Sequence, residues 1–162
     1  MKNILTSIAL LFTLNSFSYG HCQVPCGIYN DVVRIVQIKE DITTMWKAMN
    51  QINSLSGKTD SQSMNQLVRW VTTKESHAKN IQNTVTEYFL AQRIKPKNKG
   101  EEGRQKYVNQ TLLMQQVIVS AMKCKQTVDP LHCEKITELL EQFSKIYLDE
   151  HGFNHLESLE KN

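Results

Sequence analysis

Two cysteines and a histidine lie close together near the start of the chain, in the order His21-Cys22-Gln23-Val24-Pro25-Cys26. If the mature chain begins at His21, its free amine and the backbone nitrogen of Cys22 close a five-membered chelate ring on a metal ion. The same nitrogen and the Cys22 thiolate close a second ring, and the Cys26 thiolate reaches the fourth corner. Two nitrogens and two sulfurs in a square suit Ni(II) or Cu(II) better than tetrahedral zinc.

The amine donor exists only if the preceding residues are removed, and residues 1–20 have the features of a leader peptide. Lys2 is followed by a mostly apolar run over 4–17, and Ser18-Tyr19-Gly20 offers small residues for cleavage. The apolar run is shorter than the roughly 20 residues that span a membrane. We therefore expect cleavage after Gly20, a mature domain over 21–162, and no membrane association after processing.

The donor set also favours redox chemistry. Thiolates and a deprotonated amide donate electrons strongly and stabilise a higher oxidation state such as Ni(III), and the His21 imidazole is free to approach axially. Binding displaces the amide and thiol protons, so assembly should weaken as the pH falls.

The segment His21–Tyr29 follows the pattern His-Cys-x-x-Pro-Cys-Gly-x-Tyr at every fixed position, and in this it resembles the nickel hook of nickel superoxide dismutases. Glu87-Tyr88-Phe89 is similar to the acidic-Tyr-Phe segment of that family's second helix. The resemblance covers roughly residues 21–150. It implies a four-helix bundle that assembles as a homohexamer, with one nickel ion per subunit, and it implies conversion of two superoxide ions and two protons to dioxygen and hydrogen peroxide.

We call residues 21–29 the hook, and the resemblance also implies roles for several of its residues. His21, Cys22 and Cys26 would bind nickel, and Pro25 and Gly27 would shape the turn. Tyr29 would stand near the open axial face and limit entry to small species.

Outside the hook, the resemblance implies that Tyr88 belongs to the same pocket, although its place among apolar residues equally fits core packing. The family's best-studied branch holds the axial imidazole with a Glu and an Arg. Glu40, Arg69 and His77 are candidates here, and the spacing does not choose among them. That branch also has an acidic residue where Gln23 stands, so the charge at the mouth of the site differs.

Behind the hook, apolar residues recur in steps of three and four, which predicts an all-α antiparallel four-helix bundle over about 30–150. Asn30 or Asp31 can cap the first helix, whose buried face would include Ile35 to Ile52. A second helix is predicted over about 61–93, a third over about 102–123, and a fourth around 136–147. The polar run 72–77 marks either a helix end or a wet functional stretch, and residues 151–162 are expected to fray.

The remaining cysteines, Cys124 and Cys133, flank the turn before the fourth helix. In an exported protein such a pair favours a disulfide, which would stabilise the fold by about 2–3 kcal/mol through loop entropy. The formal charge of +3 comes without a long basic run, so nothing indicates nucleic-acid binding.

These observations predict export to the periplasm or the medium, or a cytoplasmic enzyme if the leader is only a maturation pro-peptide. A processing peptidase and a nickel donor would then act on the chain. Two other functions stay open at this stage. One is a non-enzymatic exported bundle that buffers nickel or copper, and the other is a disulfide-stapled interaction module.

Overall fold

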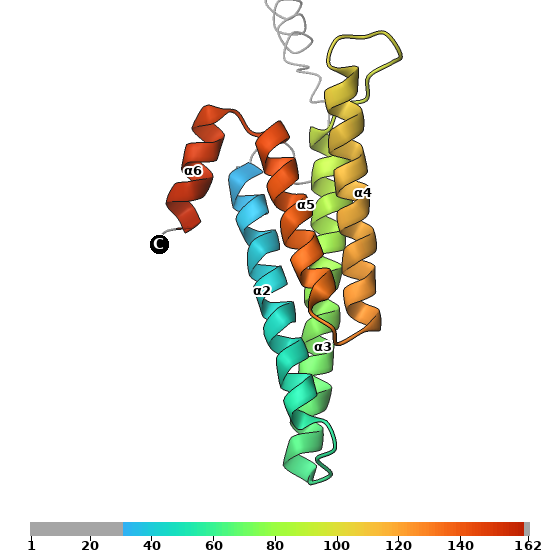
Figure 1. Cartoon of the computed structure of the whole chain (residues 1–162), viewed down its shortest axis with the longest axis vertical. Coiled ribbons are helices and arrows are strands. Elements are labelled where there is room, and N and C mark those ends of the chain that lie inside the picture. Colours follow the sequence, from blue (N-terminus) through green and yellow to red (C-terminus); the bar gives the residue numbers. More distant parts are fainter. Residues whose placement is uncertain (1–30, 161–162) are drawn as a thin grey trace, which may run out of the picture.

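The computed structural model describes residues 31–160, and every regular element in that range is helical. The order is α2 (Asp31–Leu55), α3 (Ser61–Asn83), the π-helix η1 (Thr84–Arg93), α4 (Arg104–Gln126), α5 (Leu131–Tyr147) and α6 (Glu150–Glu160). η1 continues α3, so four long helical segments run alternately down and up, and α6 lies beside α2 (Figure 1). The prediction of an all-α antiparallel bundle is confirmed. The leader and the hook lie outside the described residues.

The buried face of α2 is the one that the sequence predicts. Its apolar residues alternate in steps of three and four, which places them on one side of a 3.6-residue helix. They are buried against the other helices: Ile35, Ile38, Ile42, Met45, Met49 and Ile52. Toward the end of the bundle where α5 finishes, the core becomes aromatic. The ring of Phe143 lies edge-on to Phe89 at 5.1 Å and stacks on Tyr147 at 4.7 Å.

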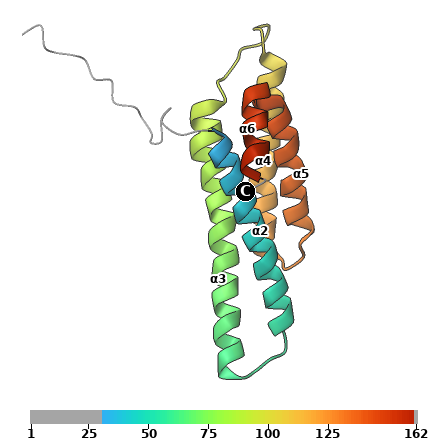
Figure 2. The same ribbon diagram turned by 90° about the vertical axis from the view of Figure 1, so that its left-hand side faces the viewer.

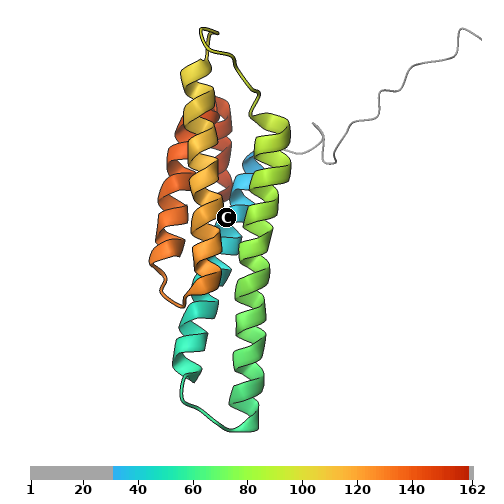
Figure 3. The ribbon, with the colours of Figure 1, turned by 90° about the vertical axis from the view of Figure 1, so that its right-hand side faces the viewer.

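The alternating directions bring distant parts of the chain to one end of the bundle. α2 and α4 begin there, and η1 and α5 finish there (Figures 1 and 3). At the opposite end, Asp60 caps α3 by accepting a hydrogen bond from the Ser63 backbone nitrogen at 2.9 Å. The chain that leaves the hook therefore enters the bundle beside the last residues of η1 and α5.

The α2–α3 hairpin extends past the turn between α4 and α5 (Figures 2 and 3). Met64, Val68 and Val71 recur at the spacing of one helix face of α3, but they are 46, 62 and 39% exposed. Trp46 on α2, which the sequence leaves as a core or subunit-interface residue, is 48% exposed and so does not lie in the core of this subunit. No other described helix covers this face, because the turn between the end of α4 and the start of α5 lies short of it (Figures 2 and 3).

Two details of the prediction change. The polar run 72–77 does not end a helix, because α3 passes through it without a break. The prediction that residues 151–162 fray is wrong for the part described, where α6 forms. Asp149 accepts a hydrogen bond from the Gly152 nitrogen at 2.7 Å at the start of α6, and Leu156 is buried in the core. Among the described helices, none is both long and apolar enough to cross a membrane.

Candidate functional site

One carboxylate joins three helical segments where the chain from the hook enters the bundle. Oδ1 of Asp31 accepts a hydrogen bond from the Tyr88 hydroxyl. The same oxygen lies 2.7 Å from Nε and 2.6 Å from Nη2 of Arg93. Oδ2 accepts from the Tyr147 hydroxyl at 2.7 Å. We call Asp31, Tyr88, Arg93 and Tyr147 the Asp31 cluster.

The π-helical geometry of η1 explains how Tyr88 and Arg93 reach one carboxylate. Residues five apart point in different directions on an α-helix, whereas the wider turn of a π-helix with i to i+5 bonding brings them to the same side. The Arg93 guanidinium accordingly lies 5.4 Å from the centre of the Tyr88 ring. Such π-turns are rare and often occur at functional sites.

Burial and the neighbouring carboxylate hold both phenols of the cluster in their protonated form. Burial, the Asp31 hydrogen bond and the Asp31 charge together raise the pKa of Tyr88 to about 12. The same causes, burial first, raise the pKa of Tyr147 above its ordinary value. A phenol with a raised pKa is a poor acid, so near neutral pH both hydroxyls act as hydrogen-bond donors to Asp31.

A polar groove runs from Tyr88 along the line where α2 meets α3 and η1. Its first hollow, of about 150 Å³, is lined by Arg34, Asn83, Thr84, Glu87 and Tyr88. The adjoining hollow, of about 300 Å³, shares Asn83 and Thr84 with the first and is also lined by Glu40 and Asp41. Arg34 lies 5.7 Å from the centre of the Tyr88 ring. Around Tyr88, the positive charges of Arg34 and Arg93 are therefore matched by the carboxylates of Glu87 and Asp31.

The three candidate partners for the His21 imidazole, Glu40, Arg69 and His77, do not all lie in the same part of the structure. Nδ1 of His77 lies 2.5 Å from Oδ1 of Asp41, and His77 lines one hollow together with Glu40. Arg69 is exposed on the protruding part of α3. It lies more than about 20 Å from Tyr88 along the helix, at about 1.5 Å per residue. Of the three candidates, Glu40 lines the groove, and His77 lines a neighbouring hollow that shares Glu40 and Asp41 with it.

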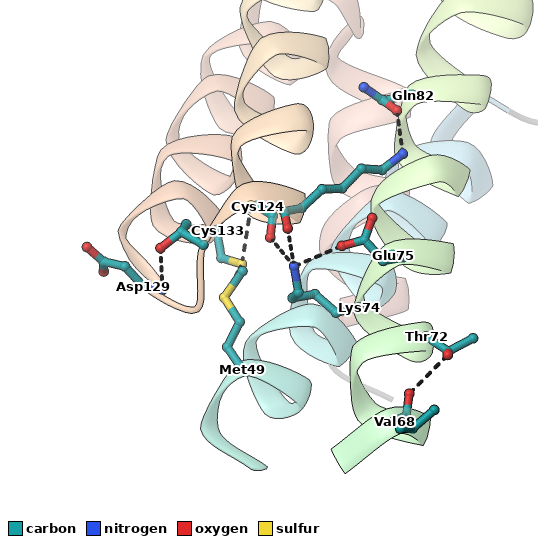
Figure 4. Close-up of polar contacts among 11 residues, drawn as sticks. Met49, Val68, Thr72, Lys74, Glu75, Gln82, Cys124, Asp129 and Cys133 are labelled. Atoms are coloured by element: carbon teal, nitrogen blue, oxygen red, sulfur yellow. Dashed lines mark hydrogen bonds and ion pairs between the residues drawn. The ribbon is translucent and has the colours of Figure 1, made fainter. Parts of the chain in front are cut away.

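The polar run on α3 has a structural role that the sequence did not reveal. Lys74 is 3% exposed, and its ammonium group donates to the backbone oxygens of Cys124 and Lys125 at 2.8 and 2.6 Å (Figure 4). These carbonyls belong to the last turn of α4, where the helix has no further backbone N–H groups to donate to them. Glu75 completes the contact at 3.0 Å. Lys74 therefore ties α3 to the C-terminal end of α4.

Cys124 and Cys133 lie side by side at the same end of α4, as their spacing predicts, but the predicted disulfide is not formed in the structure. Both are buried free thiols whose Sγ atoms are 3.7 Å apart, against about 2.05 Å in a disulfide. The Cys133 sulfur also lies 3.8 Å from Sδ of Met49 (Figure 4). The physical reason is that sequence spacing brings two sulfurs together, whereas their bonding depends on the redox conditions.

The predicted metal ligands and hook residues, His21, Cys22, Pro25, Cys26 and Gly27, lie outside the described residues, as does Tyr29. In the part of the chain that is described, no three His, Cys, Asp or Glu side chains gather closely enough to hold a metal ion. Tyr88 is the one predicted site residue that the structure places in a polar cluster.

Sequence reasoning missed the partners of Tyr88. From the sequence, Asp31 is only a candidate helix cap, and Arg93 and Tyr147 are only the last residues of predicted helices. The closeness of Asp31 to the hook, two residues after Tyr29, was the one available signal.

The chain matches the family model described as nickel-containing superoxide dismutase over residues 16–151, which is well over half of its length and includes the hook. Comparisons with curated proteins and with solved structures find no match. The family match joins the N-terminal donor set and the helical bundle in one known kind of enzyme. The chain therefore belongs to the nickel-containing superoxide dismutase family, whose members are oxidoreductases that use nickel and act on superoxide.

Proposed function

We propose that the mature chain dismutates superoxide at a nickel ion held by its own N-terminal hook. His21 would supply its amine and, axially, its imidazole, Cys22 its backbone nitrogen and thiolate, and Cys26 a second thiolate. When bound, nickel supplies one-electron redox chemistry between Ni(III) and Ni(II). Over one cycle, two superoxide ions and two protons become dioxygen and hydrogen peroxide, so electrons, atoms and charge balance.

The observation that carries this proposal is the complete hook pattern over His21–Tyr29 inside a family match that begins before it. The donor set fits the metal on chemical grounds. Two nitrogens and two thiolates form a tetragonal set, and they stabilise the oxidised form of nickel.

Tyr88 supports a pocket beside the hook. Tyr29 is two residues before Asp31, so covalent geometry keeps their Cα atoms within about 7 Å. Asp31 in turn accepts the hydrogen bond of Tyr88. We propose that Tyr29 and Tyr88 together limit the approach to the metal to small species. Because its pKa is about 12 and its one proton is donated to Asp31, Tyr88 would order water by accepting a hydrogen bond and would not supply the protons that the reaction consumes.

We further propose that the chain assembles as a homohexamer. The exposed apolar residues of the protruding hairpin support association: Met64, Val68 and Val71 recur on one face of α3. An exposed apolar row of this kind is typical of a surface that another protein covers. The number of subunits rests on the family resemblance.

Maturation would precede activity. We propose that a peptidase cleaves the leader after Gly20, that the mature chain is exported, and that a nickel donor loads it, a step that added nickel salt would replace in vitro. The composition of residues 1–20 supports this proposal, since a basic residue, an apolar run and small residues occur in the order of an export signal.

The decisive experiment compares three preparations in a superoxide-consumption assay. The first is a chain that starts at His21 with nickel, the second is the same chain without nickel, and the third carries one alanine before His21. We expect turnover in the first alone, because the added residue converts the amine donor to an amide. Cys22→Ser and Cys26→Ser should each abolish turnover in the first preparation.

Other outcomes identify the competing functions. Nickel or copper uptake without superoxide turnover would indicate a metal-buffering protein. Full turnover in the chain extended by alanine would contradict the proposed ligand set. The helical content of each variant, measured by circular dichroism, serves as the folding control, because the ligands precede the described bundle.

A further inference from the structure

The Asp31 cluster ties the start of α2 to two other segments at the point where the hook joins the bundle. Its hydrogen bonds link Asp31 to residues 57, 62 and 116 positions away in sequence, on η1 and α5. Tyr88 is only 2% exposed, and its ring packs edge-on against Phe89 at 5.2 Å. Because the ring is held by packing and the hydroxyl by the carboxylate, Tyr88 has one defined orientation.

We propose that Asp31 is a positioning residue for the superoxide dismutase reaction. It orients the Tyr88 hydroxyl, and it fixes the start of α2, two residues after the hook ends. This proposal rests on the proposed function, which places Tyr88 in the pocket of the metal. Asp31 acts through Tyr88 and through the chain, and it is not itself assigned contact with substrate.

Nearby arginines compensate the negative charge of Asp31, which would otherwise repel an anionic substrate. The groups that face Tyr88 are Asp31 and Arg34 from α2, Glu87 and Arg93 from η1, and Tyr147 from α5. Arg93 pairs directly with Asp31 at 2.6 Å, and Arg34 adds a second positive charge near the ring. The two arginines balance the two carboxylates, so Asp31 can order the phenol without leaving a net negative charge to repel superoxide.

The first test measures the ionisation of Tyr88 in the nickel-free mature chain, by the absorbance change of tyrosine between pH 8 and 13. Comparison with Tyr88→Phe identifies the signal of this residue among the tyrosines. We expect Asp31→Asn to lower the pKa of Tyr88 from about 12, because the negative charge is gone and only a weaker, neutral acceptor is left while both arginines remain. Asp60→Asn, which keeps a capping side chain at the opposite end of the bundle, should leave the titration unchanged.

The second test follows superoxide turnover against pH in the nickel-loaded enzyme. We expect Asp31→Asn to lower turnover about 10-fold or more near neutral pH, and to move the alkaline limb of the profile to lower pH together with the Tyr88 titration. Asp31→Glu, which keeps the carboxylate, should recover part of both effects. A residue that served only packing would lower activity without moving the alkaline limb.

Folding and function are separated by design. If Asp31→Asn fails to give wild-type helical content, Asp31→Ser, which also suits a helix start, takes its place. A folded variant with an unchanged tyrosine titration and an unchanged pH–rate profile overturns the proposal. If the wild-type chain shows no turnover, the proposed function fails and with it the role of Asp31 in catalysis, while the titration still reports whether Asp31 holds Tyr88.

Discussion

Oδ2 of Asp31 accepts a hydrogen bond from the Tyr147 hydroxyl at 2.7 Å, across 116 positions of sequence. This contact joins the first residue of α2 to the last residue of α5. The first and the last of the four long helical segments therefore meet at one carboxylate. Oδ1 of the same group serves Tyr88 and Arg93 from η1. One carboxylate oxygen therefore contacts η1, and the other contacts α5.

Removing this hydroxyl should weaken the fold. Tyr147→Phe deletes a hydrogen bond to a charged group and keeps the ring that stacks on Phe143, so we expect a loss of about 1–2 kcal/mol in the free energy of unfolding. Urea denaturation followed by circular dichroism measures the change. Tyr107→Phe, on α4, is the matched control and should stay within about 0.5 kcal/mol of wild type. Equal effects for the two variants would contradict this role of Tyr147.

The raised pKa values of Tyr88 and Tyr147 predict a loss of stability in alkali. In the unfolded chain these phenols titrate near pH 10, and in the folded chain the pKa of Tyr88 is about 12. A group whose folded pKa is raised contributes stability that is complete below its unfolded pKa and is lost as the pH rises through the folded one. The urea midpoint of the wild-type chain should therefore fall between about pH 10 and 12.

The phenylalanine variants provide the control for this alkaline effect. Tyr88→Phe and Tyr147→Phe each remove one of the titrating groups, so the decline in their urea midpoints over the same pH range should be smaller than in wild type. A decline of the same size in the double variant would mean that other groups cause it.

Lys74 should be important for the stability of α3 against α4. Lys74→Met keeps most of the buried stem but leaves the carbonyls of Cys124 and Lys125 without their donor, so we expect a loss of about 2–3 kcal/mol. The same substitution at Lys79, which is exposed on the same helix, should change the free energy of unfolding by less than about 0.5 kcal/mol. Equal losses of stability for the two variants in thermal unfolding would contradict the assigned contact.

The thiols of Cys124 and Cys133 should respond to oxidants as a pair. Because their sulfurs are in contact at 3.7 Å, a thiol oxidant should join them with the loss of two hydrogen atoms, and a reductant should restore them. Intact-mass measurement with and without denaturant detects both forms. Cys133→Ser provides the control, in which Cys124 should stay a buried thiol that reacts with alkylating reagents only after unfolding. Rapid alkylation of folded wild-type chain at both sites would contradict the burial.

The protruding hairpin predicts how assembly can be disturbed. Val68 is 62% exposed, so Val68→Glu should leave the helical content unchanged while placing a charge in a surface that we propose another subunit covers. We expect a lower mass in solution by light scattering after size-exclusion chromatography. Gln62→Glu, also exposed on α3, adds the same charge outside that apolar row and should keep the wild-type mass. An unchanged mass for Val68→Glu would exclude this residue from the interface.

The metal chemistry that we propose and the class of the fold both follow from local features of the sequence. The donors of the hook lie within six residues, so their chelate rings follow from covalent geometry and need no tertiary structure. The helices follow from the local period of the apolar residues, and α2 buries the face that its period predicts. The exposed part of α3 shows the limit of this reasoning, since a period identifies a face but not whether another helix is long enough to cover it.

The meeting of polar groups from distant parts of the chain follows instead from how the helices pack. Asp31, Tyr88, Arg93 and Tyr147 come together because the up-and-down order brings one helix start and two helix ends to the same end of the bundle, and because a π-turn aligns residues five apart. Lys74 finds its carbonyl partners on α4 by the same long-range packing. Such contacts depend on the ends and register of separate helices, which the burial of the whole core determines and no local pattern records.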